Sequence, residues 1–212
     1  MDAILDQIGS HKLVPVIIIE NKEDAVPLAE ALINGGLPVA EVTFRTKSAK
    51  ESIELIAKKF PSMLIGAGTV LTVDQVKAAV EAGAKYIVSP GLNSKVVEYC
   101  VSNNISITPG IATPSEIEKA LEFNLEVVKF FPAEALGGIK YLKAISAPYG
   151  NLKFIPTGGV DENNLLGYLQ FSKVLACGGS WMVKSEFISQ KQFELITKLT
   201  EEARGIVRMI AK

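Results

Sequence analysis

The sequence predicts an α/β fold, specifically a (β/α)8 TIM barrel with a short helix before the first strand. Strand-like and helix-like segments alternate regularly along the 212 residues, without a linker or low-complexity break. Several strand candidates are apolar on both faces, which is typical of a parallel sheet covered by helices. The turn after the first strand candidate lacks the GxGxxG pattern that would favour an open doubly wound sheet. Residues 1–212 are therefore expected to form one barrel domain.

Eight short segments, rich in apolar and β-branched residues, are expected to be the barrel strands. They are residues 14–20, 38–45, 63–67, 86–89, 106–109, 125–131, 153–157 and 174–177.

The segments between these strands carry helical spacing and helix-end signals. Residues 23–34 and 49–59 repeat apolar side chains at intervals of three and four, as an amphipathic helix does. The run Thr113-Pro114-Ser115-Glu116 is a capping box with proline at the first helical position. A short helix is expected over 1–9 and a long amphipathic helix over about 190–211.

Composition excludes several function classes. The net charge is -1 and no basic run stands out, so a nucleic-acid partner is not expected. No apolar stretch approaches the ~18 residues that span a membrane, and the first residues do not resemble a signal peptide. Cys100 and Cys177 lack CxxC spacing, which favours a reduced cytoplasmic protein. With His11 as the one histidine, a His-based metal site is not expected, although a carboxylate-bound magnesium stays possible.

A lysine lies inside the expected sixth strand, in the run Leu125-Glu126-Val127-Val128-Lys129-Phe130-Phe131. Lysine is rarely buried without a partner or a function. Burial disfavours the ammonium form, and a neutral lysine is a nucleophile that can form a Schiff base with a carbonyl substrate. The alternative is a structural lysine whose amine reaches the strand end or pairs with a carboxylate.

The second strand candidate is polar on one face only. Glu41, Thr43 and Arg45 share that face and are expected to point into the barrel, because the other face is apolar. Glu41 would lie deep, either as a general acid/base or in a structural ion pair with Lys129. Arg45 would lie at the mouth, where it could hold a substrate carboxylate or remain a solvated rim residue.

Paired glycines follow the last two strand candidates, in Thr157-Gly158-Gly159 and in Gly178-Gly179-Ser180. Phosphate sites in such barrels are built from the loops after strands seven and eight. Glycines let backbone N–H groups approach a phosphate, and the Ser180 hydroxyl can add a hydrogen bond. One such pair would indicate only a tight turn, but two in adjacent loops predict a phosphate site.

Three further residues are expected near the substrate. Thr69 ends the third strand candidate and can hydrogen-bond a carboxylate. Pro90 follows the fourth strand and shapes the rim. Phe131 shares the parity of Lys129 and is expected to wall the imine pocket with an apolar ring.

Together these segments resemble the 2-keto-3-deoxy-6-phosphogluconate / 4-hydroxy-2-oxoglutarate aldolase family, essentially from end to end. The resemblance lies in EVTFRT (41–46), GAGTV (66–70), SPG (89–91), VKFFPAE (128–134), PTGG (156–159) and GGSW (178–181).

The resemblance implies a class I aldolase without metal or cofactor, acting on a small-molecule substrate as a homotrimer. Lys129 would form the Schiff base, and Glu41 would be the general acid/base. The expected reaction cleaves 2-keto-3-deoxy-6-phosphogluconate to pyruvate and glyceraldehyde 3-phosphate, with 4-hydroxy-2-oxoglutarate as a second possible substrate. Substrate contacts would come from Arg45, Thr69, Pro90, Phe131, Thr157, Gly158, Gly159, Gly179 and Ser180.

Three alternatives stay open to different degrees. A member of the same family could act on a galactonate-type or unphosphorylated 2-keto-3-deoxy acid. A deoxyribose-phosphate-type aldolase needs a second lysine near the first, and neither Lys140 nor Lys153 is well placed for that. A non-catalytic phosphosugar-binding barrel would leave Lys129 paired and unreactive.

Overall fold

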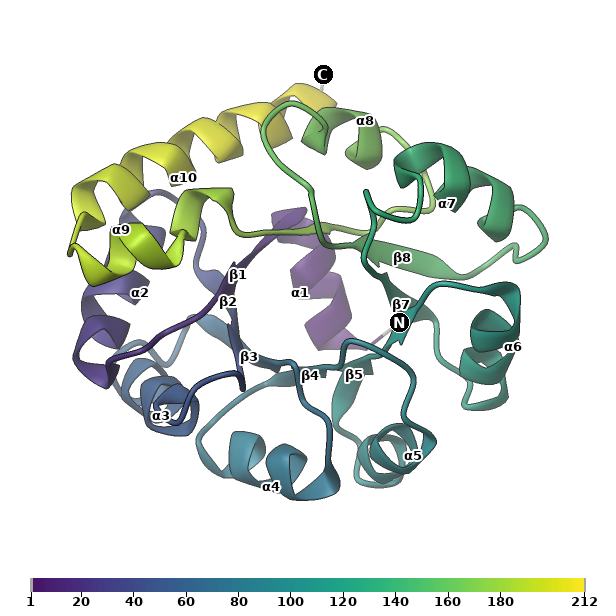
Figure 1. Ribbon diagram of the computed structural model, residues 1–212, viewed down its shortest axis with the longest axis horizontal. Helices are drawn as coiled ribbons and strands as arrows, with labels where there is room; N and C mark the ends of the chain where they lie inside the picture. Colours follow the sequence, from purple (N-terminus) through teal and green to yellow (C-terminus); the bar gives the residue numbers. More distant parts are fainter. Residues whose placement is uncertain (1, 212) are drawn as a thin grey trace.

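The computed structural model describes residues 2–211, and its strands form the predicted barrel (Figure 1). Every pairing between neighbouring strands is parallel. The strands are β1 (Leu13–Ile17), β2 (Val39–Thr43), β3 (Leu64–Gly68), β4 (Tyr86–Val88), β5 (Ser106–Thr108), β6 (Gly110–Ile111), β7 (Val127–Phe130), β8 (Lys153–Pro156) and β9 (Cys177–Gly179).

The strands close into a ring through two sheets. One sheet has the order β5-β4-β3-β2-β1-β9, and the other has β6-β7-β8. Isolated bridges from Phe154 to Val174 and from Thr157 to Gly178 join β8 to the last strand segment. On the other side, β5 and β6 are consecutive halves of one barrel strand around Pro109, whose carbonyl accepts a hydrogen bond from the Lys129 N–H.

The last strand begins three residues later than the sequence predicted. β9 spans Cys177–Gly179 and not 174–177, because these residues pair in register with Leu13–Pro15 of β1. Glycine has a low strand propensity, so the local pattern pointed to the apolar residues before it. The register is decided by space: a methyl group at Gly178 would lie 2.4 Å from the Thr157 hydroxyl oxygen.

Helices surround the ring, as Figure 1 shows. The predicted capping box at Thr113 and Glu116 is present. The long helix expected over about 190–211 begins at Phe193, because the chain first turns through a left-handed residue, Lys191. The helices are α1 (Ala3–His11), α2 (Ala25–Asn34), α3 (Ala49–Lys59), α4 (Val73–Glu81), α5 (Ser94–Ser102), α6 (Pro114–Glu122), α7 (Gly138–Ser146), α8 (Leu165–Leu169), α9 (Ser185–Ser189) and α10 (Phe193–Arg208), with 3-10 turns η1 (Lys22–Asp24), η2 (Trp181–Val183) and η3 (Met209–Ala211).

Helix α1 differs from the others because it lies across the centre of the ring (Figure 1). It covers the end where the strands begin. The Asp2 carboxylate caps the helix by accepting from the Leu5 N–H at 2.8 Å, and it also accepts from the Ser106 hydroxyl at the start of β5 at 2.8 Å. Ile8 of α1 is buried below the barrel interior. Helix α1 therefore closes the barrel interior at the end where the strands begin, and the interior opens at their carboxyl-terminal ends.

The barrel interior is arranged in levels set by strand register. Val16, Glu41, Gly66 and Tyr86 are partners across β1, β2, β3 and β4. The polar Glu41 and the large aromatic Tyr86 thus lie at the same level of the interior as Gly66. No helix within residues 2–211 has both the length and the apolar character needed to cross a lipid bilayer.

Candidate active site

The predicted lysine and glutamate meet inside the barrel. Lys129 Nζ lies 3.3 Å from Glu41 Oε1, and the two side chains are 7% and 5% exposed. Lys129 comes from β7 and Glu41 from β2, on opposite sides of the ring, so only barrel closure brings them together. A buried ion pair of this kind is weak evidence for stability, because desolvation offsets much of the Coulomb attraction. A chemical role therefore explains this ion pair better than a contribution to stability does.

Glycines in β3 make room for Glu41 and for Tyr86. A methyl group at Gly68 would lie 2.1 Å from Glu41 Oε1, and one at Gly66 would lie 2.3 Å from the Tyr86 ring. The outward residue between them, Ala67, carries a side chain that packs in the core. The inward face of β3 must therefore be glycine for the acidic side chain to occupy the barrel axis.

Tyr86 is a site residue that sequence analysis missed. Its hydroxyl donates to the Ala40 carbonyl at 2.8 Å, next to Glu41 in the chain. Burial, together with the nearby Glu41 carboxylate, raises the pKa of Tyr86 well above its ordinary value, so the phenol stays protonated and remains a donor. The inward parity of Tyr86 within its strand could have revealed it, but the apolar character of the run concealed the signal.

A small inner cavity separates the ion pair from helix α1. Its volume is about 10 Å³, on the scale of one water molecule and far too small for a substrate. It is lined by Ile8, Val14, Glu41, Tyr86, Val88, Thr108, Lys129, Ile155 and Thr157.

A larger mouth cavity of about 290 Å³ lies above the inner one. It is lined by Val16, Ile18, Arg45, Phe131, Thr157, Gly158, Gly159, Val160, Gly178, Gly179 and Ser180. Thr157 lines both cavities, and the Phe131 ring centre lies 5.2 Å from Lys129 Nζ. The amine thus lies close to Phe131, an aromatic residue of the mouth cavity, and the role of Phe131 as a wall of the imine pocket stays a prediction.

Arg45 and Thr69 form a polar pair at the rim. Arg45 lies beyond the end of β2 and is exposed, and its Nε donates to the Thr69 hydroxyl at 3.2 Å. The two terminal guanidinium nitrogens remain able to grip a carboxylate as a fork. Thr69 has φ of 55°, a left-handed conformation that is strained for a β-branched residue and is characteristic of functional sites. Thr43, the third polar residue of β2, is buried and donates to the Ile17 carbonyl at 2.9 Å.

The two glycine loops meet in the mouth cavity, as predicted. Gly158 and Gly159 have φ of 97° and 81°, which a residue with a side chain adopts only under strain. Gly178 and Gly179 lie within β9, and a methyl group at Gly179 would lie 2.0 Å from the Trp181 ring. Bare backbone from two neighbouring segments thus faces one cavity, beside Ser180.

Pro90 is not brought into the mouth cavity. It lines a separate open depression with Val70, Leu71 and the residues that follow it. Its carbonyl oxygen would lie 2.0 Å from a methyl group at Gly110, the β6 residue that pairs with Lys129. Pro90 therefore shapes the wall next to the lysine strand, and its substrate contact remains a prediction.

The geometry does not support the deoxyribose-phosphate-type alternative, which needs a second lysine near the first. Lys140 lies within the outer helix α7, and Lys153 begins β8 at the far end of the barrel, where its amine donates to the Ser172 carbonyl. Of these three lysines, Lys129 alone lies in the barrel interior.

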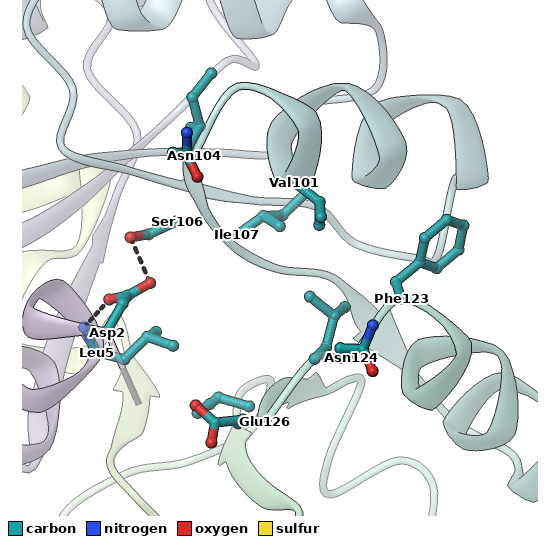
Figure 2. A pocket seen from close by; sticks show the side chains of 12 residues that line it. Asp2, Leu5, Val101, Asn104, Ser106, Ile107, Phe123, Asn124 and Glu126 are labelled. Carbon is teal, nitrogen blue, oxygen red and sulfur yellow. Dashed lines mark hydrogen bonds between the residues drawn. The ribbon is translucent and has the colours of Figure 1, made fainter.

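Another cavity, here called the base cavity, lies at the opposite end of the barrel, where β5 and β7 begin (Figure 2). Its volume is about 340 Å³. Figure 2 shows the Asp2 carboxylate engaged by both the Leu5 N–H and the Ser106 hydroxyl, so this acid is used for capping. The lining is Asp2, Leu5, Val101, Asn104, Ile105, Ser106, Ile107, Phe123, Asn124, Leu125, Glu126 and Val127.

Comparison with known proteins agrees with this geometry. The family model described as KDPG and KHG aldolase matches residues 4–199. A 2-dehydro-3-deoxy-phosphogluconate aldolase of Treponema pallidum is 48% identical over 207 residues, which cover 98% of this chain and 99% of that protein. A KHG/KDPG aldolase of Escherichia coli is 44% identical over 191 residues, 90% of each chain.

Solved structures give the same assignment. The KDPG aldolase of Legionella pneumophila, with pyruvate captured as a covalent carbinolamine, has a TM-score of 0.91 and 42% identity, covering 94% of this chain and 97% of that one. The 2-keto-3-deoxy-6-phosphogluconate aldolase of Zymomonas mobilis with 3-phosphoglycerate has a TM-score of 0.87 and 38% identity, with 94% of each chain covered. The chain belongs to the KDPG and KHG aldolase family.

Proposed function

We propose that this protein is a class I aldolase that cleaves 2-keto-3-deoxy-6-phosphogluconate to pyruvate and glyceraldehyde 3-phosphate through a Schiff base on Lys129. The observation that carries the proposal is the buried contact of 3.3 Å between the Lys129 amine and the Glu41 carboxylate beneath the mouth cavity. An amine next to a carboxylate supplies a nucleophile and a proton carrier together. Family membership supports the reaction class.

The first half of the reaction forms the imine. Lys129 Nζ passes a proton to Glu41, and the neutral amine adds to the ketone of the substrate to give a carbinolamine. Glu41 supplies the proton with which the hydroxyl leaves as water. The protonated imine that results is an electron sink, stabilised by the same carboxylate that then carries negative charge.

The second half breaks the carbon–carbon bond. Glu41, directly or through a water, takes the proton of the hydroxyl two carbons from the imine carbon. The bond electrons move into the imine, so the aldehyde leaves and an enamine remains on Lys129. Protonation of the enamine carbon and addition of water then release pyruvate and restore the free amine.

Substrate orientation follows from the two sides of the mouth. The Arg45 fork and the Thr69 hydroxyl take the carboxylate next to the ketone. The backbone of Gly158, Gly159 and Gly179, with the Ser180 hydroxyl, takes the phosphate at the other end of the substrate. Thr157, which lines both the inner cavity and the mouth cavity, would contact the substrate hydroxyls.

A second activity, cleavage of 4-hydroxy-2-oxoglutarate to pyruvate and glyoxylate, is favoured by the names of the relatives, one of which is a KHG/KDPG aldolase. This substrate keeps the carboxylate and ketone that Lys129 and Arg45 require and lacks the phosphate. We further infer one aldolase domain over residues 1–212 and a homotrimer, which sedimentation equilibrium would test. The cysteines Cys100 and Cys177, both buried and free, support a cytoplasmic location.

Imine trapping tests the proposal. The protein would be incubated with pyruvate and borohydride, and the modified residue located by peptide mass spectrometry. A reduced pyruvate adduct on Lys129 is expected, and a Lys129→Arg variant is expected to give none, whereas the matched variant Lys153→Arg keeps it. No adduct in the wild type, or adducts spread over surface lysines, would overturn the class I assignment and favour a non-catalytic phosphosugar-binding barrel.

A further inference from the structure

The loop that follows β8 is tied down on the side away from the mouth cavity. The Gly158 carbonyl accepts from the Glu134 N–H at 3.0 Å, and the Gly159 carbonyl accepts from Asn164 Nδ2 at 2.9 Å. In a trans peptide the N–H points opposite to the C=O. The N–H of Gly159 therefore points away from Glu134, and the N–H of Val160 points away from Asn164.

These directions matter because of what lines the cavity. Gly158, Gly159 and Val160 line the mouth cavity, and neither Glu134 nor Asn164 is among the lining residues. Drawing the two carbonyls outward thus turns the N–H groups of the same peptides towards the cavity. An anion there meets the N–H groups of these two peptides and not their carbonyl oxygens, as in other backbone anion sites.

The side chain of Asn164 holds the loop backbone in this orientation. Its Nδ2 donates to the Gly159 carbonyl, and its Oδ1 accepts from the Asp161 N–H at 2.9 Å. Since one partner is an acceptor and the other a donor, a single orientation of the amide satisfies both. Asn164 therefore bridges the loop across Val160, and an aspartate in its place could not donate to Gly159.

The loop needs such a bridge because of its glycines. Gly158 and Gly159 both have positive φ, and glycine loses more conformational freedom on ordering than any other residue. A loop that is already ordered spares the ligand that ordering cost. The bridge thus contributes to anion affinity without touching the anion.

Helix α8 supports the loop a second time, through Glu134. Asn164 is the N-cap of α8, and the hydroxyl of Tyr168 in the same helix donates to the Glu134 carboxylate. A methyl group at Gly159 would lie 2.6 Å from Glu134 Cβ, so the glycine loop packs directly on this residue.

We propose that Asn164 is a positioning residue that makes the enzyme select phosphorylated over unphosphorylated substrates. The inference rests on the proposed function and deepens it. Asn164 holds the Gly158–Val160 backbone in its anion-binding form, whereas Lys129, Glu41 and Arg45 act on the part of the substrate that both classes share.

The test compares two neighbouring asparagines. The variants Asn164→Asp and Asn164→Ala would be assayed beside Asn163→Asp and Asn163→Ala, whose side chain is exposed and is not part of the bridge. Steady-state rates would be measured with 2-keto-3-deoxy-6-phosphogluconate and with unphosphorylated 4-hydroxy-2-oxoglutarate. Inhibition by inorganic phosphate would serve as a direct probe of the anion site.

Both Asn164 variants are expected to raise KM for the phosphorylated substrate about tenfold, which corresponds to about 1.4 kcal/mol of binding. Their kcat, their rates with 4-hydroxy-2-oxoglutarate and all parameters of the Asn163 variants should change less than about threefold, a difference of under 1 kcal/mol. Phosphate inhibition should weaken in parallel. Equal losses on both substrates, or no loss on either, would overturn the proposal.

Two measurements keep the result clear. If Asn164→Asp does not fold, amide hydrogen exchange in the wild type decides: phosphate should slow exchange at Gly159 and Val160, and unchanged exchange would overturn the inference. Pyruvate trapping on Lys129 involves no phosphate group. A positive trap with unaltered selectivity in the Asn164 variants rejects this inference alone, whereas a failed wild-type trap rejects the proposed function.

Discussion

The two ends of this barrel contain similar amounts of space but very different chemistry. The mouth cavity, of about 290 Å³, has bare glycine backbone, an arginine fork and a buried amine directly beneath it. The base cavity, of about 340 Å³, is lined mainly by apolar residues such as Leu5, Ile107 and Val127. Its Asp2 carboxylate is used to cap α1. Cavity volume therefore does not identify the site. The unusual groups held there identify it: the buried amine, the arginine fork and the bare glycine backbone.

The contrast has a physical origin in the parallel barrel. Every strand ends at the mouth, so polar residues from many parts of the chain converge there. At the base, α1 covers the strand starts, and packing is the main requirement. Changes at the mouth should therefore affect rate, and changes at the base should affect stability.

The largest expected effect is at Lys129. Lys129→Arg keeps a positive charge beside Glu41 but removes the nucleophilic amine, so kcat/KM should fall by about 10⁴-fold or more while the protein stays folded. Steady-state assays with circular dichroism would measure both. Lys153→Arg, at the base end of β8, is the matched control and should keep wild-type activity. Substantial activity in Lys129→Arg would contradict the imine mechanism.

The second-largest effect is expected at Gly68, a residue without a reactive side chain. In Gly68→Ala the new methyl group would lie 2.1 Å from Glu41 Oε1, so the carboxylate must move. Displacement of a catalytic group by about 1 Å costs about 10²-fold, mainly in kcat. Gly205→Ala in α10, where a methyl group meets open space, is the control. A normal kcat in Gly68→Ala would show that the Glu41 position is not critical.

The reverse outcome is expected at the base. Leu5→Ala removes a buried side chain of α1 and should lower the free energy of unfolding by about 2–4 kcal/mol. The kcat of the folded enzyme should stay unchanged, because Leu5 lines the base cavity and no residue of α1 lines the mouth cavity. Urea unfolding and assays well below the unfolding midpoint would separate the two quantities. A fall in kcat comparable to that of Gly68→Ala would remove the distinction between the ends.

The smallest effect is a pH dependence at His11, where α1 meets α10. Burial, and then the charge of Arg204, lowers the pKa of His11 below 6.5. The unfolded chain thus takes up the proton more readily, so stability should decline as pH falls below 6.5 towards the pKa of the folded state. His11→Gln should flatten this slope in urea unfolding at pH 7.5 and 5.5, without altering the pH profile of kcat. An equally steep slope in His11→Gln would assign it to other groups.

Much of the mouth could be predicted because its signals are local. A lysine in a strand apolar on both faces, the polar parity of β2 and the paired glycines are each visible within a few residues. The capping box at Thr113 is a local signal too, whereas α1 runs to His11, two residues beyond its predicted end. Such patterns reflect backbone geometry and burial, which neighbouring residues largely determine.

Other features could not be predicted because they depend on contacts between distant segments. Nothing in the sequence distinguishes Gly66 and Gly68 from other glycines. Only the structure shows that Tyr86 and Glu41 occupy the space beside them. The β9 register, the position of Pro90 outside the mouth cavity and the bridge made by Asn164 have no local signal.

By itself, the sequence determined the barrel, the lysine buried within it and the residue types at the mouth, since periodicity and composition encode which side chains are buried and at which strand end they lie. Only the tertiary structure decided that Lys129 lies 3.3 Å from Glu41, at a separation of 88 residues in the chain. The reason is that strand closure, register and steric exclusion are properties of the whole ring. No segment of the chain contains that information alone.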